Sequence, residues 1–370
     1  MNNYADETSK YGDEPVLQEE PMASSWSGGG SWRRFLRVLD PRDFGVLHVL
    51  VLLIIVFSIW QPDTFPTWKT ATAILSQNAI PGILALGLTV PLAVGEFDLS
   101  IGYVLGTASI FVGWCLGHSG MSVVESIALT LAMVFAFGII NSLLVVGVGL
   151  NSFIATLATG SLLQAVIQTI SHGLTLANGV QRISDLSTSN IGEITLPAII
   201  MFVICGLLWL LLSLTPAGRR MYATGLARDA AILSGVRTAR LRVVAFIVSA
   251  LGAGIAGILV TAQVGASSPT VGPPLMIPAF AAAFLGSTQV RPGFFNAWGT
   301  LLAVLMLGTL NYGLALAGVP EWVPYLSTGS VLIVALAMGR IREQGVPIAL
   351  RRLFRRTAGR MPVTAAEGSA

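Results

Sequence analysis

The titratable and thiol side chains of this sequence show none of the spacings that catalysis or metal binding requires. The three histidines, His48, His118 and His172, stand far apart, and no HExxH or similar pair of metal ligands occurs. Glu96 and Asp98 are two residues apart, which on a helix points them to different faces and suits no acid–base pair. The two cysteines lack CxxC spacing. We therefore expect no catalytic residues, no cofactor and no metal.

The polar side chains within the apolar stretches are mostly neutral amides and hydroxyls. Such groups exchange hydrogen bonds with an uncharged, hydroxylated solute without the cost of burying a charge, but they equally bond one helix to another. A break in an apolar stretch at residues 95–100 marks either part of a solute pathway or simply the N-cap of the next helix. The residues that we assign to a candidate substrate pathway are Ser76, Gln77, Asn78, Asp98, Ser100 and Asn311.

The composition places these residues in a membrane. Of the 370 residues, 54% are hydrophobic and 11% are charged, whereas a soluble domain has about a quarter charged. The 40 glycines are scattered through apolar stretches, where small residues let membrane helices approach closely. Because a crossing needs about 20 apolar helical residues, we predict an all-α, polytopic transmembrane bundle of about ten spans, near 44–60, 71–95, 99–117, 123–146, 153–171, 194–214, 241–262, 277–289, 298–317 and 323–339.

The placement of lysine and arginine predicts the orientation of these spans. With both termini in the cytoplasm, all but Lys69 and Arg182 of the 21 basic residues fall in cytoplasmic segments. The basic excess is thus explained by the membrane, and no nucleic-acid partner is expected. The basic segment 346–360 is interpreted as lying near anionic membrane lipid, with RNA binding as the weaker alternative.

Three regions follow from this topology. Residues 1–43 form an acidic cytoplasmic tail of disordered composition with a basic end beside the membrane. Residues 44–339 form the transmembrane domain, including a cytoplasmic loop at 215–241, and residues 340–370 form a basic cytoplasmic tail.

The energy source must be external to this chain. A GxxxxGK[ST] phosphate loop occurs nowhere in it, so we expect a transport subunit without its own ATPase site. Ion-coupled carriers commonly place acids within their spans. Here the acids between residues 44 and 339 map to span ends or loops. An ion-coupled secondary carrier for a small neutral solute therefore stays as the alternative.

The cytoplasmic loop contains a short stretch with helical composition, Arg228 to Ser234, which is followed by Gly235 in the position of a helix C-cap. Ala230, Ala231 and Leu233 supply a small apolar patch. Such a helix is suited to binding in a groove of a soluble partner, although it could equally be an inert surface helix.

Several short segments, in shared order and spacing, resemble one family: the permease subunits of ATP-binding-cassette importers for monosaccharides of the ribose and related pentose/hexose type. The similarity extends from about Phe44 to Gly339. Its motifs here are E-F-D-L-S-I-G at 96–102, S-F-I-A-T-L at 152–157, G-R-R-M-Y-A at 218–223, L-S-G-V at 233–236 and L-N-Y-G-L at 310–314. Residues 225–230 read G-L-A-R-D-A where the family usually reads G-G-N-E-A-A, so the polarity of the contact with the ATPase is expected to differ.

The resemblance implies an importer of a neutral monosaccharide or polyol in the bacterial inner membrane. It implies cytoplasmic ATP-binding subunits, an extracytoplasmic sugar-binding protein and a homodimer or heterodimer of permeases. It also implies that the stretch from Gly225 to Gly235 couples to the ATPase, through Gly225, Arg228, Asp229, Ala230, Leu233, Ser234 and Gly235.

Overall fold

The computed structural model describes residues 41–118 and 121–344, and the predicted tails lie largely outside them. The described chain is mostly helical, and a long helix lies at each of the ten predicted spans. These helices are α2 (Pro41–Trp60), α3 (Trp68–Ala93), α4 (Ile101–His118), α5 (Val123–Ser142), α6 (Ser152–Ser171), α8 (Leu196–Trp209), α11 (Thr238–Val264), α12 (Pro273–Gly286), α13 (Ala297–Leu316) and α14 (Trp322–Gln344).

Shorter elements connect them. The connection after α6 carries a 3₁₀ turn, η2 (Val180–Ile183), the short helix α7 (Asp185–Thr188) and a hairpin of two-residue strands, β1 (Asn190–Ile191) and β2 (Ile194–Thr195). This antiparallel hairpin is a small departure from the all-helical prediction. Single π-helical turns, η1 (Leu143–Gly147) and η3 (Leu210–Leu214), extend α5 and α8, and the predicted cytoplasmic loop holds α9 (Pro216–Leu226) and α10 (Arg228–Leu233).

Side-chain caps fix where several helices begin. Thr67, Asn151 and Asn296 each accept a hydrogen bond from an N–H in the first turn that follows, at the starts of α3, α6 and α13. Ser122 does the same for α5, and Glu125 bonds back to the Ser122 N–H, which completes a capping box. These bonds satisfy N–H groups that no helical carbonyl can reach.

Six described helices are long and apolar enough to cross a membrane by length and composition: α3, α5 with η1, α6, α8 with η3, α11 and α13. The apolar parts of α2, α4, α12 and α14 are shorter. Pro81 and Pro91 do not divide α3, which runs through both as one helix of 26 residues.

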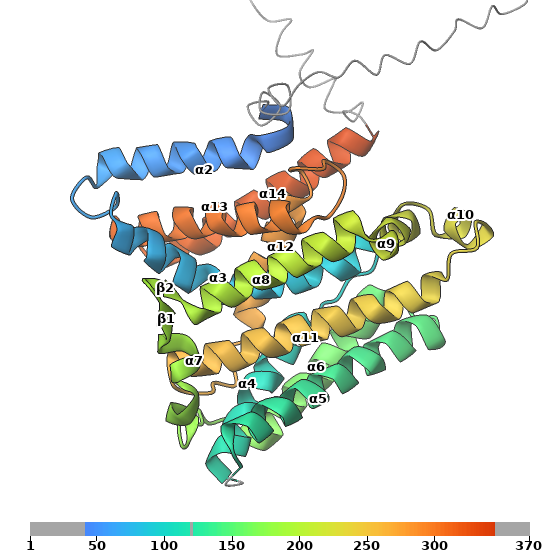
Figure 1. Ribbon diagram of the computed structural model, residues 1–370, viewed down its shortest axis with the longest axis horizontal. Helices are drawn as coiled ribbons and strands as arrows, with labels where there is room; N and C mark the ends of the chain where they lie inside the picture. The colour runs from blue at the N-terminus through green and yellow to red at the C-terminus, as the bar shows by residue number, and fades with distance from the viewer. Residues whose placement is uncertain (1–40, 119–120, 345–370) are drawn as a thin grey trace, which may run out of the picture. The chain divides into compact units, whose positions relative to one another are not determined.

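Helix α11 is central to the packing: it contacts α3, α4 and α5, while α3 also contacts α8, α12 and α13 (Figure 1). Close approach of α3 and α11 depends on facing glycines, because a Cβ added to Gly252 would lie 3.1 Å from the Cα of Gly87. Helices α9 and α10 lie at one end of the long helices, and α7 with the hairpin lies at the other (Figure 1).

Substituting Gly252 by leucine should therefore separate α3 from α11. We expect Gly252→Leu to lower the free energy of unfolding by roughly 1–3 kcal/mol, the usual cost of overpacking, and to lower the melting temperature measured in detergent. Gly206→Leu is the matched control, because a Cβ at Gly206 of α8 would meet nothing within 4 Å. Equal melting temperatures for the two variants would contradict this account of the contact.

Candidate functional site

The segment predicted to couple to an ATPase consists of two short helices that the sequence specifies locally. Thr215 caps α9 by accepting a hydrogen bond from the Gly218 N–H, and Pro216 occupies the first turn, where its missing N–H costs nothing. Helix α10 ends at Leu233 and is followed by a turn at Gly235, whose φ of +79° is easy only for glycine. There the N–H of Gly235 donates to the Ile232 carbonyl and the N–H of Val236 to the Ala231 carbonyl. The predicted short helix and its stop at Gly235 are confirmed.

The apolar side chains exposed on this segment differ from those expected. Ala231 is buried, whereas the exposed fraction is 68% for Leu226, 49% for Ile232 and 90% for Leu233. We call Leu226, Ile232 and Leu233 the apolar tip. Of the other residues assigned to coupling, Gly225, Arg228, Asp229, Ala230, Ser234 and Gly235 are all exposed.

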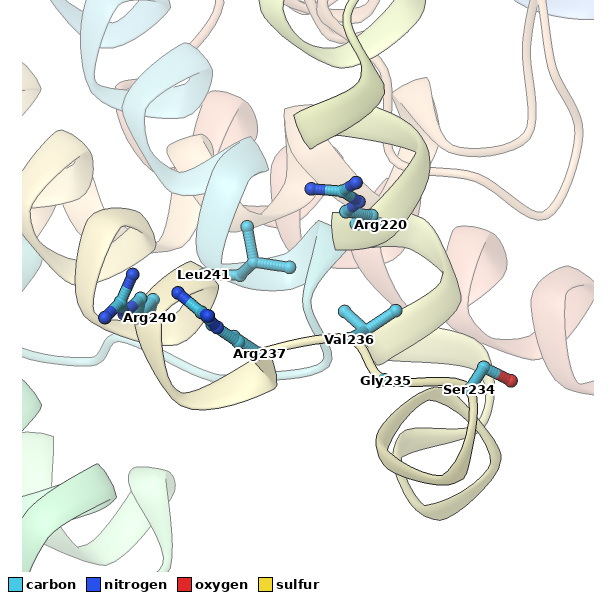
Figure 2. A pocket seen from close by; sticks show the side chains of 7 residues that line it. All are labelled: Arg220, Ser234, Gly235, Val236, Arg237, Arg240 and Leu241. Carbon is cyan, nitrogen blue, oxygen red and sulfur yellow. The ribbon is translucent and has the colours of Figure 1, made fainter.

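A hollow of about 430 Å³ lies beside α10 and is basic. Figure 2 shows Arg220 from α9 on one side of Leu241, and Arg237 and Arg240 from the start of α11 on the other. The remaining lining comes from Ser234, Gly235 and Leu241. We call this site the basic hollow.

The end of α9 contacts the loop that joins α3 to α4. A Cβ at Gly225 would collide with the carbonyl oxygen of Ala93, and a Cβ at Gly95 would lie 3.3 Å from the Cα of Gly225, so both positions need glycine for this approach.

A buried tyrosine on the same helix, α9, makes a second contact. The Tyr222 hydroxyl donates to the Phe295 carbonyl at 2.7 Å. Burial raises the pKa of Tyr222 to about 12, although the charge of Arg291 opposes the shift. The phenol therefore stays protonated and able to donate at physiological pH.

The same loop is held by side chains from two further helices. Ser152 and Thr156 of α6 accept hydrogen bonds from the Phe97 and Leu99 N–H groups at 3.1 and 2.9 Å. Asp98 is 1% exposed, and its two carboxylate oxygens accept bonds from Ser100 at 2.6 Å and from Ser249 of α11 at 2.7 Å. Asp98 also accepts from the Ser100 N–H, just before α4 begins. Asp98 thus resembles an N-cap residue of α4, which is the second of the two roles predicted for the break at residues 95–100.

Glu96 and Arg242 form a buried ion pair between this loop and α11. The Arg242 guanidinium also donates to the Val145 carbonyl at 3.4 Å. From α5, Asn141 donates to the Ser100 hydroxyl at 2.7 Å. Sequence reasoning placed Arg242 with the basic loop residues, yet Arg242 is 4% exposed. The signal that was missed is an arginine at the start of one apolar stretch together with an acid at the end of another.

The predicted pathway residues fall into two groups. Asn78 of α3 donates to the Ile74 carbonyl, and its side chain lies against Gly308 of α13. Asn311 lies about one turn further along α13 and accepts a bond from Ser327 of α14 at 3.3 Å. Ser76 is half-buried and Gln77 exposed on the same stretch of α3 as Asn78, whereas Asp98 and Ser100 belong to the loop network.

Metal ligands do not gather in this structure. Within residues 41–118 and 121–344, no group of three His, Cys, Asp or Glu side chains could hold a metal ion.

Comparison with known proteins identifies related transport proteins. The family described as "Branched-chain amino acid transport system / permease component" matches residues 70–336. The ribose import permease protein RbsC of Bacillus subtilis (strain 168) is 35% identical over 302 residues, which are 79% of this chain and 90% of that protein.

Two further relatives carry other names. The D-allose transport system permease protein AlsC of Escherichia coli (strain K12) is 27% identical, over 80% of this chain and 91% of that protein. The autoinducer 2 import system permease protein LsrD of Photorhabdus laumondii is 28% identical, over 80% and 90% respectively.

Removing one partner of the buried ion pair should destabilise the fold strongly. Arg242→Gln leaves the Glu96 carboxylate buried without its cation, and we expect a loss of about 3–5 kcal/mol in the free energy of unfolding. The double variant Glu96→Gln/Arg242→Gln should recover part of this loss, since it removes both charges. Chemical denaturation in detergent measures the effect, with the exposed Arg219→Gln as control; an Arg242→Gln variant as stable as this control would refute the role of the pair.

Proposed function

We propose that this chain, which belongs to the family of branched-chain amino acid transport system permease components, imports a neutral monosaccharide or polyol across the bacterial inner membrane. It is the permease subunit of an ATP-binding-cassette importer and a multi-pass membrane protein. The observation that carries this function is the 35% identity to a ribose import permease over 90% of that protein's length.

The class of solute follows from the names of the relatives together with the polar residues of the long helices. The ribose and D-allose permeases are named for neutral monosaccharides. The side chains of Ser76, Gln77, Asn78 and Asn311 are neutral and can exchange hydrogen bonds with sugar hydroxyls, so we place the pathway beside them. Asp98 and Ser100 are engaged by Ser249 and Asn141, and we assign them to holding the loop near the pathway.

The partners follow from membership in a family of importer permeases. Cytoplasmic ATP-binding subunits supply the energy, since the sequence carries no phosphate loop of its own. An extracytoplasmic binding protein delivers the solute, and two permeases, identical or different, form the membrane unit in contact with lipid. Gly225, Arg228, Asp229, Ala230, Leu233, Ser234 and Gly235 couple the ATPase to the membrane helices. Their exposure at one end of the helices supports this role.

We propose ten crossings with both termini in the cytoplasm. The start of α2 and the end of α14 lie toward the same end of the long helices as α9 and α10 (Figure 1), as an even number of crossings requires. The transmembrane domain then spans residues 44–339, between cytoplasmic tails at 1–43 and 340–370.

Reconstitution tests this function. In proteoliposomes, the chain with its ATP-binding subunit and its binding protein should take up sugar and hydrolyse ATP faster when sugar is present. Uptake that an ionophore abolishes, and that persists without the ATP-binding subunit, would instead identify an ion-coupled carrier.

Changes at α10 should uncouple the two activities. Gly235→Pro is incompatible with a φ of +79° and removes the N–H that donates to Ile232. Asp229→Lys reverses an exposed charge. We expect sugar-stimulated uptake to fall roughly two- to thirtyfold in each variant, while melting temperature and basal ATP hydrolysis are retained.

Gly235→Ala is the matched control for the proline variant. It strains the backbone at a φ of +79° but keeps the N–H that donates to Ile232, so its uptake should fall less than that of Gly235→Pro. Normal uptake in both Gly235→Pro and Asp229→Lys would remove the coupling role from α10.

A further inference from the structure

The basic hollow is lined by three positively charged side chains. Arg220, Arg237 and Arg240 are exposed, and none of them forms an ion pair with a residue in the part of the chain that the structure describes. Like charges that converge on one site repel one another. The turn at Gly235 leads the chain from α10 into α11, where Arg237 and Arg240 line the same hollow as Arg220 of α9 (Figure 2). The local fold thus gathers these charges, although no acidic side chain among residues 41–118 and 121–344 pairs with them.

We infer that the basic hollow receives a carboxylate side chain of the ATP-binding subunit while the apolar tip packs against the same subunit. This inference rests on the proposed function and specifies the chemistry of the contact. The partner's surface should hence combine an apolar groove with an acidic rim.

The chemistry of the lining favours a carboxylate. Guanidinium groups bind carboxylates through paired N–H donors, which gives such contacts geometric specificity. A hollow of about 430 Å³ leaves room for an acidic side chain to enter. Interfaces commonly surround apolar anchors with charged groups that steer association and fix orientation. The apolar tip supplies the anchors, and the hollow supplies the charges.

The position of the site favours a protein over a lipid headgroup. Membrane proteins carry an excess of lysine and arginine in their cytoplasmic loops. This rule explains why basic residues occur on this side, but it does not explain why three of them line one hollow. An anionic headgroup could neutralise the arginines, yet it would leave Leu233 uncovered, which is 90% exposed. Helix α10 extends beyond the adjacent ends of α8 and α11 in Figure 1, away from the apolar lengths of the helices. One protein surface can cover both features.

Binding measurements in a neutral membrane test the inference. The full chain is placed in nanodiscs of phosphatidylcholine alone, and its affinity for the purified ATP-binding subunit of its own importer is measured by fluorescence anisotropy. Measurements are made at about 0.1 M and about 1 M salt, between which the screening length falls from about 10 Å to about 3 Å. The triple variant Arg220→Gln/Arg237→Gln/Arg240→Gln should bind roughly tenfold more weakly at the lower salt, with a smaller salt dependence.

Single variants and a matched control complete the test. Each single arginine-to-glutamine change in the hollow should weaken binding roughly two- to fivefold. Arg219→Gln, which removes an exposed charge from the same helix outside the hollow, should bind like the unmodified chain.

Three results would overturn the inference. Unchanged binding by the triple variant would show that no carboxylate enters the hollow, and tighter binding would assign it to an acidic segment of this chain. If the measurement is repeated in nanodiscs that contain anionic lipid, a loss of affinity that appears only there would assign the arginines to lipid. Failure of the unmodified chain to bind the subunit at all would instead contradict the proposed function.

Discussion

Burial of two carboxylates in the loop between α3 and α4 is the constraint on which the arrangement of the long helices depends. An ionised carboxylate cannot remain in an apolar interior unless it is paired or hydrogen-bonded. Glu96 meets this requirement through Arg242, and Asp98 meets it through Ser100 and Ser249. Both carboxylates thereby fix the loop to α11, while Ser152 and Thr156 fix the loop backbone to α6. Displacing any of these helices alone would leave a buried polar group without its partner.

The same loop connects the segment that we propose couples to the ATPase with the long helices. Gly225 at the end of α9 lies directly on the backbone of Ala93 and Gly95, with no side chain between them. Backbone contacts of this kind have little room to slide, because even one methyl group would collide. A movement of α9 that preserves the contact must therefore move the loop, and through Ser249 and Arg242 it must also move α11. Only two sets of interactions separate the proposed ATPase contact from the centre of the helix packing. They are the contact of Gly225 with the loop and the contacts of the loop with α11.

Sequence patterns predicted the helices far better than the interactions between them. The length of each apolar stretch was enough to place the ten long helices, and a glycine after an alanine- and leucine-rich stretch was enough to end α10. The pairing of Glu96 with Arg242 joins residues 146 positions apart, and only the packing of α11 against the loop brings them together. Helix α10 has six residues, too few for periodicity to show that Ala231 faces inward and Ile232 outward. Proline normally disrupts the interior of a helix, yet α3 continues through Pro81 and Pro91.

The charged and the neutral polar groups lie in different places, and this explains how the solute path can lie in this chain while the energy comes from another subunit. The buried charged groups Glu96, Asp98 and Arg242 are committed to one another or to neighbouring hydroxyls, and a coupling ion that displaced these partners would weaken the loop that holds α6 and α11 together. Asn78 and Asn311, on α3 and α13, can exchange hydrogen bonds with a hydroxylated solute at little cost, since neither carries a charge whose burial must be offset. Transport through such a path needs the helices to move but needs no proton or ion to bind within them. In the proposed mechanism, the force for that movement enters where the structure exposes apolar and basic side chains together, at α10 and the basic hollow.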